Sequence, residues 1–132
     1  MRDTAPPRVL AFDASREYFF VEGCHILELS NSAEDGEVSI ARARVEPGVT
    51  TRWHALEGIT ERYLILEGQG RVEVGEQPPG LVGPGDVVLI PPGCRQRIAN
   101  AGPADLVFLA ICSPRFVPER YRDADPAGGE SR

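Results

Sequence analysis

Residues 48–70, GVTTRWHALEGITERYLILEGQG, decide the fold that we predict for this chain. The apolar run at residues 63–66 ends at Gly68 and Gly70, which indicates a buried strand closed by a turn. A second stretch, residues 85–100 (GDVVLIPPGCRQRIAN), has the same build, with a strand, a Pro-Pro-Gly turn and a short second strand. Two such stretches about one hairpin apart predict two walls of one β-barrel.

The first stretch carries side chains suited to metal ligation or to acid–base chemistry. Alternate residues of a strand share a face, so Glu61, Tyr63 and Ile65 point the same way, into an apolar run. His54 lies on the preceding strand. A carboxyl group in an apolar barrel has a raised pKa, which would suit Glu61 to act as a general acid or base. The hydroxyl of a buried Tyr63 needs a partner, and it could supply a proton or orient a substrate.

The two stretches resemble the two motifs of the cupin family. The first motif, in which a glycine precedes His-x-His, a glutamate and a second glycine, is matched by Gly48, His54, Glu61 and Gly68. The second motif is matched by Gly85, Pro91, Gly93 and Asn100. Two histidines of the family pattern are replaced, one by Leu56 and the other by Gln96.

The resemblance implies an all-β fold, a small double-sheet β-barrel of the cupin or jelly-roll type, and a homodimer joined through an N-terminal strand. It also implies that His54, Glu61 and Gln96 converge inside the barrel as metal ligands. Imidazole, carboxylate and amide oxygen form a mixed set suited to Mn²⁺, Fe²⁺, Ni²⁺ or Zn²⁺. Only one of the three is anionic, so we expect weaker binding than in a cupin with three histidines and a glutamate.

Composition excludes several classes of protein. The net charge of −6 argues against nucleic acid as a partner, because such binding depends on neutralising phosphates. The chain has no run of about 18 apolar residues, so we expect no membrane span. Its polar N-terminus is unlike a secretory signal, so we expect a cytoplasmic protein. All fourteen basic residues are arginines, which excludes Schiff-base chemistry on lysine. Three cysteines without CxxC spacing predict free thiols.

The organisation of the chain supports the fold without help from the resemblance. Many short strands, with turns every 8 to 12 residues and no convincing amphipathic helix, predict a sandwich or barrel. We expect residues 1–15 to form a flexible arm, residues 16–117 the barrel, and residues 118–132 a polar tail.

Residues 38–45, VSIARARV, alternate strictly, with Arg42 and Arg44 on one face and small residues on the other. Small residues inside would leave cavity space, whereas arginines inside would create an anion site. Solvated arginines are the default, because unpaired arginine is rarely buried. His25 is a further candidate ligand only if its strand lines the mouth of the barrel.

These observations predict a small metal-dependent cupin-type enzyme that acts on a small polar or anionic organic molecule by isomerase, lyase or dioxygenase chemistry. Glu61 and Tyr63 are the candidate catalytic residues, and Arg42 or Arg44 would bind a substrate anion. The alternative is a non-catalytic module that binds a small molecule, with Leu56 marking the loss of the metal and an unmetallated Glu61 at the centre of the pocket.

Overall fold

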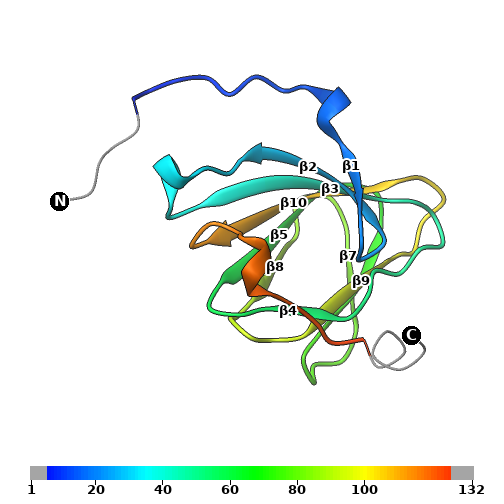
Figure 1. The fold of residues 1–132 in the computed structure, drawn as a ribbon. Helices are drawn as coiled ribbons and strands as arrows, with labels where there is room; N and C mark the ends of the chain where they lie inside the picture. The colour runs from blue at the N-terminus through cyan, green and yellow to red at the C-terminus, as the bar shows by residue number, and fades with distance from the viewer. Residues whose placement is uncertain (1–5, 126–132) are drawn as a thin grey trace.

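The computed structural model describes residues 6–125, which form a barrel of two antiparallel sheets (Figure 1). The six-stranded sheet has the order β1 (Tyr18–Phe20), β2 (Cys24–Ser30), β3 (Ser39–Val45), β10 (Leu106–Ser113), β5 (Thr60–Glu67), β8 (Val87–Ile90). The five-stranded sheet has the order β11 (Tyr121–Asp123), β4 (His54–Leu56), β9 (Gln96–Asn100), β6 (Gly70–Val74), β7 (Gly80–Val82). The predicted all-β double-sheet barrel is confirmed.

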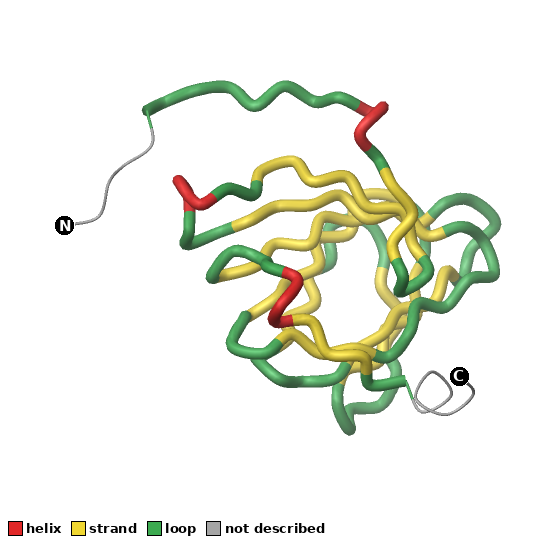
Figure 2. Tube along the Cα trace, in the orientation of Figure 1, coloured by secondary structure: helices red, strands yellow, loops and turns green. Residues whose placement is uncertain are grey.

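Helical structure within residues 6–125 is limited to three short 3-10 turns at the periphery of the barrel, Ala14–Arg16, Ala33–Asp35 and Pro118–Arg120 (Figure 2). None of the helices in this part of the chain has the length and apolar character needed to cross a membrane. The three cysteines are free thiols, as the sequence predicts.

The alternation predicted for residues 60–67 is confirmed by burial along β5. Glu61, Tyr63 and Ile65 are buried, whereas Arg62 and Leu64 between them are only partly buried. The same alternation operates on β3, where the small residues face inward and the arginines face outward. The choice left open for β3 is therefore settled by packing, since the inward face lies against the opposite sheet.

The core fills one end of the barrel with large apolar side chains from both sheets. Val45, Ile65, Ile98 and Leu106 are 1% exposed or less, and Phe108 packs among them. Each such side chain contributes about 1.5 to 3 kcal/mol by leaving water. This end of the barrel supplies the rigid frame on which the other end depends.

The two ends of the chain contribute unequally to the barrel. Residues 6–13 run along the outside without joining a sheet (Figure 1). At the other end the sequence places residues 118–132 outside the barrel, but the structure pairs Tyr121–Asp123 with β4. The sheet therefore extends to Asp123. The three residues of β11 are too few to show a strand pattern in the sequence. Residues 1–5 and 126–132 of the two predicted tails lie outside the described residues.

The outer edge of the six-stranded sheet is formed by β1, whose side chains are unusually apolar for an exposed strand. Phe19 is 66% exposed, and Val21 just after the strand is 68% exposed. An open edge of this kind can pair with a second chain. The homodimer implied by the family resemblance stays a prediction.

Gly68 and Gly85 give a matched pair of substitutions for testing the fold. Both have a left-handed φ, +88° and +93° respectively, which costs an alanine about 1 to 2 kcal/mol. A Cβ at Gly68 would also lie 2.6 Å from the Asp105 carbonyl oxygen, whereas one at Gly85 meets nothing within 4 Å. We expect Gly68→Ala to lower the free energy of unfolding by at least about 1 kcal/mol more than Gly85→Ala, measured by urea denaturation. Equal losses would contradict the close approach at Gly68.

Candidate functional site

A pocket opens at the end of the barrel where the inward side chains become small. Along β3 and β10 the large core residues give way to Ser39, Ala41, Ala110 and Cys112, which line the pocket. Ala41 and Ala110 are direct cross-strand partners, so their short side chains leave space at the same level of the sheet. The cavity has a volume of about 490 Å³, including the space open to solvent at its mouth.

His54, Glu61 and Gln96 converge at this end of the barrel, as the sequence predicts. His54 and Gln96 are direct partners across β4 and β9, and Glu61 comes from β5 in the opposite sheet. Their exposed fractions are 2%, 0% and 7% for His54, Gln96 and Glu61. Glu61 and His54 line the pocket, and so does Leu56, which stands at a histidine position of the family motif.

A chain of hydrogen bonds fixes the carboxyl group of Glu61. The Gln96 amide nitrogen donates to Glu61 Oε1 at 2.7 Å, and the Tyr63 hydroxyl donates to the Gln96 amide oxygen. Both ends of the Gln96 amide are therefore used inside the protein. Among the described residues, no hydrogen bond reaches Glu61 Oε2, so that oxygen is free to meet a ligand in the pocket.

Burial dominates the electrostatics of Glu61. The pKa of its carboxyl is raised to about 7, chiefly because burial removes the group from water; His54 and the Gln96 hydrogen bond lower the pKa, and the nearby Glu22 raises it. A group that titrates near neutral pH can both accept and donate a proton.

The His54 ring is oriented by its surroundings. Its Nδ1 lies 2.9 Å from the Arg52 carbonyl oxygen, which only accepts hydrogen bonds, so Nδ1 carries the hydrogen in this contact. Its Nε2 then faces the carboxyl group of Glu22 at 3.7 Å. The Tyr121 ring stacks on the imidazole with centroids 5.3 Å apart and an interplanar angle of 10°.

Glu22 and Tyr121 are site residues that the sequence reasoning missed. Glu22 lies in the turn between β1 and β2, and its carbonyl accepts from the Arg52 amide at 2.9 Å, which brings the turn to the strand of His54. Its side chain is 13% exposed, and burial raises the pKa of its carboxyl while His54 and Cys24 lower it. A glutamate before a glycine in a turn gives no local signal of a buried role.

The arrangement does not fit the predicted metal-ligand set of His54, Glu61 and Gln96. The amide nitrogen of Gln96 faces Glu61, and an N–H group donates hydrogen bonds and does not bind a cation. In residues 6–125 no three His, Cys, Asp or Glu side chains are grouped so that they could hold a metal ion. The divalent metal, Mn²⁺, Fe²⁺, Ni²⁺ or Zn²⁺, stays a prediction.

The other candidate residues lie away from the pocket. Arg42 and Arg44 are on the outward face of β3, where both pair with Glu17, and Arg44 also pairs with Asp105. His25 pairs with Glu46 at 2.7 Å. None of these three lines the pocket. The structure therefore does not bring the predicted substrate-binding arginines to the site.

Solved structures with the same fold are numerous. A predicted oxalate decarboxylase from Thermotoga maritima is 30% identical, with a TM-score of 0.62, and the match covers 69% of this chain and 80% of that one. A conserved protein with a double-stranded β-helix domain from Klebsiella pneumoniae is 13% identical, with a TM-score of 0.73 and coverage of 89% and 99%. Pac13 of Streptomyces, a nucleoside dehydratase, is 16% identical, with a TM-score of 0.71 and coverage of 87% and 90%.

No curated protein sequence matches this chain. The sequence profile of the cupin domain, however, matches residues 41–112, which run from the inward small residues of β3 through both glycine-spaced motifs to the end of β10. This match covers more than half of the chain and agrees with the barrel and with the residues converging in it. The chain belongs to the cupin family.

Proposed function

We propose that this chain is a small cupin enzyme that moves protons on a small organic molecule, in an isomerisation or an elimination. The observation that carries the proposal is Glu61, a buried carboxyl with one free oxygen facing a pocket and a pKa near 7. Such a group is stable in either protonation state at neutral pH, which general acid–base catalysis requires.

The roles follow from the position of each group. Ionised Glu61 would remove a proton from a carbon of the substrate through Oε2. The bonding electrons of that carbon would form a double bond, and the oxygen at the far end of the reacting group would receive a proton from Nε2 of His54 in its protonated, imidazolium form. In a dehydration that oxygen leaves as water. In an isomerisation it remains as an enol, whose O–H proton would return to His54 Nε2 while protonated Glu61 delivers its proton to the neighbouring carbon of the double bond. Glu22 would orient the imidazole and stabilise its positive charge.

Gln96 and Tyr63 have a positioning role in this scheme. Neither lines the pocket, and together they hold Glu61 Oε1 so that Oε2 points into the cavity. The sequence proposed Tyr63 as a proton donor or as a positioning residue, and its hydrogen bond to Gln96 favours the second role. Misplacement of a catalytic group by about 1 Å can cost a factor of about one hundred in rate.

Two of the structural relatives carry descriptions of enzymes. Pac13 is described as a nucleoside dehydratase, and the Thermotoga maritima protein as a predicted oxalate decarboxylase. A dehydration is an elimination of the kind proposed here. This likeness supports an enzyme within the fold without naming the substrate of this chain.

The non-catalytic binding module is the competing function. It is favoured by the pocket wall, which is mostly apolar and includes Leu56 at a ligand position of the family motif. A module of this kind would bind its ligand without exchanging the ligand's protons with solvent. Proton exchange therefore separates the two functions.

The first test is deuterium incorporation in D₂O. Pools of small carbonyl and hydroxy compounds would be incubated with the protein, and exchange at carbon followed by proton NMR. We expect wild type to exchange at least one compound, and Glu61→Gln to lose a factor of about 10² to 10⁴ in rate because the base is gone. Glu76→Gln, a change of the same charge at a 94% exposed side chain, serves as control. Equal rates in wild type and Glu61→Gln would contradict the role of Glu61.

The second test is the dependence of stability on pH. The folded-state pKa of Glu61 is raised above its usual 4.5 to about 7, so the folded protein binds this proton more tightly than the unfolded chain. Its contribution is present below about pH 4.5 and is lost as pH rises through 7. Between pH 5 and 8 we expect wild type to lose on the order of 2 to 3 kcal/mol of unfolding free energy more than Glu61→Gln. Parallel pH profiles from urea denaturation would show that Glu61 titrates normally.

The third test concerns the metal. Both ends of the Gln96 amide are hydrogen-bonded within the protein. Gln96→His replaces this amide with an imidazole directly opposite His54, which creates a second nitrogen donor. We expect Mn²⁺, Ni²⁺ or Zn²⁺ to raise the melting temperature of Gln96→His and to leave that of wild type nearly unchanged. At a metal concentration of a hundred times Kd, the gain in the free energy of unfolding is about 2.7 kcal/mol. Saturable stabilisation of wild type, abolished in Glu61→Ala, would instead establish the metal site predicted from the sequence.

A further inference from the structure

The charges around the pocket are of one sign. Three glutamates, Glu22, Glu28 and Glu61, are among the residues that line it, whereas no arginine within residues 6–125 does. His54 is the one basic side chain in the lining formed by the described residues. Arg16 and Arg115 act on Glu28, but in the described part of the chain the more deeply buried pair Glu22 and Glu61 has only His54 as a positive neighbour.

Two residues of this pocket each have a polar atom without a hydrogen-bond partner in the described part of the chain. Glu61 is 7% exposed and has only Oε1 engaged by the protein. The Tyr121 hydroxyl is buried and has no hydrogen-bond partner in the described part of the chain. Buried polar groups are normally satisfied, and those that are not call for an explanation such as a missing ligand. Both groups belong to residues that line the same cavity.

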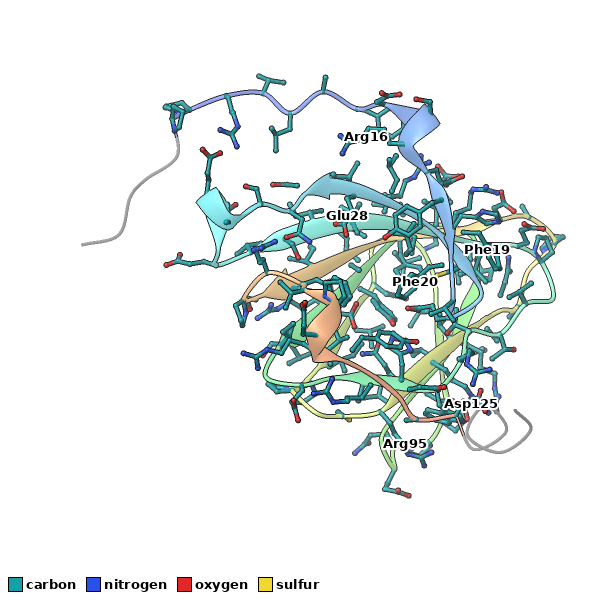
Figure 3. The ribbon with its side chains drawn as sticks, viewed as in Figure 1. Arg16, Phe19, Phe20, Glu28, Arg95 and Asp125 are labelled. Atoms are coloured by element: carbon teal, nitrogen blue, oxygen red, sulfur yellow. The ribbon has the colours of Figure 1, made fainter. Side chains whose placement is uncertain are left out.

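Aromatic rings form another part of the same lining. Tyr18 and Phe20 of β1, Phe116 and Tyr121 all line the pocket. Phe20 meets Tyr121 edge to face, with centroids 5.5 Å apart at 87°, and Tyr18 meets Phe20 at 6.3 Å and 81°. The strands that carry the labelled Phe20 and Glu28 are neighbours in Figure 3. Aromatic faces and carboxylates together are the surroundings that bind organic ammonium groups.

We propose that the ligand of this pocket is a small organic cation, an amine whose ammonium group meets Glu22 and Glu61 and whose apolar body lies against the aromatic rings. The inference rests on the proposed function in using the same pocket, and it names the substrate class of that site.

An anionic ligand is disfavoured by the same geometry. It would enter beside two buried carboxyl groups, with the arginines suited to bind it, Arg42 and Arg44, on the far side of β3. A neutral ligand would add no counter-charge to that of His54, so the charged forms of these two desolvated carboxyl groups would stay costly. Only a cation supplies what the lining lacks.

The test uses three probes of nearly equal size that differ in charge, namely benzylamine, benzyl alcohol and benzoate. Their affinities would be measured at pH 8 by titration followed in the proton–nitrogen NMR spectrum of the full chain. We expect benzylamine to bind at least about tenfold more tightly than benzyl alcohol, and benzoate to show no saturable binding. Shifted resonances should map to Phe20, Glu22 and Tyr121.

Charge-removing variants locate the effect. Glu22→Gln and Glu61→Gln should each lower the affinity for benzylamine about tenfold and leave the affinity for benzyl alcohol unchanged. Glu76→Gln should change neither affinity. Their folding would be checked by circular dichroism, and two independent variants guard against a defect in one. Benzoate binding as tightly as benzylamine, equal affinities for benzylamine and benzyl alcohol, or no binding of any probe would each overturn the inference.

These outcomes are separable from the fate of the proposed function. Amine binding without any proton exchange at carbon would support this inference and point to a binding module. Exchange on neutral or anionic compounds without amine binding would overturn this inference and leave the acid–base enzyme in place.

Discussion

A barrel of two sheets is held together by what its inward side chains place between the sheets. Here that filling is uneven along the strands. At one end Val45, Ile98 and Leu106 are fully buried, and at the other the partners Ala41 and Ala110 have side chains too short to fill the space between the sheets. Protein interiors are otherwise close-packed, so short side chains at the same level of two neighbouring strands leave a pocket. The stability that the pocket end lacks comes from the core end.

Two buried polar residues, one at each end of the barrel, differ in how fully their hydrogen-bonding atoms are used. Asn100, next to the core, donates to the carbonyls of Val45 and Ala104 and accepts from the Gly102 amide, so its hydrogen-bonding capacity is well used. Glu61, at the pocket, has one oxygen held by Gln96 and the other facing the cavity. The first arrangement fixes a loop. The second keeps a reactive group in one place while destabilising its charged form, the kind of trade between stability and function seen at active sites.

The sequence predicted the fold and part of the site because those features are local. Strand alternation within residues 60–67 predicts that Glu61 is buried, and the resemblance of residues 48–70 to the first cupin motif implies that His54 and Glu61 lie inside a barrel. Glu22 and Tyr121 could not be predicted in this way. They reach His54 through a turn and a three-residue strand whose positions depend on contacts with segments far away in the sequence. The role of Gln96 was equally hidden, because the direction of an amide depends on Tyr63 and Glu61 together.

The position of β10 has a consequence for the biosynthesis of the protein. This strand lies in the middle of the six-stranded sheet, between β3 and β5, although it follows all the other strands of that sheet in the sequence. Until it arrives, β3 and β5 each have an unpaired edge, and such edges are prone to associate with other chains. The barrel therefore closes late, and its folding depends on contacts between residues distant in the sequence. Tyr121 follows later still, so a premature stop before that residue removes one wall of the pocket even where every strand of the larger sheet has been made.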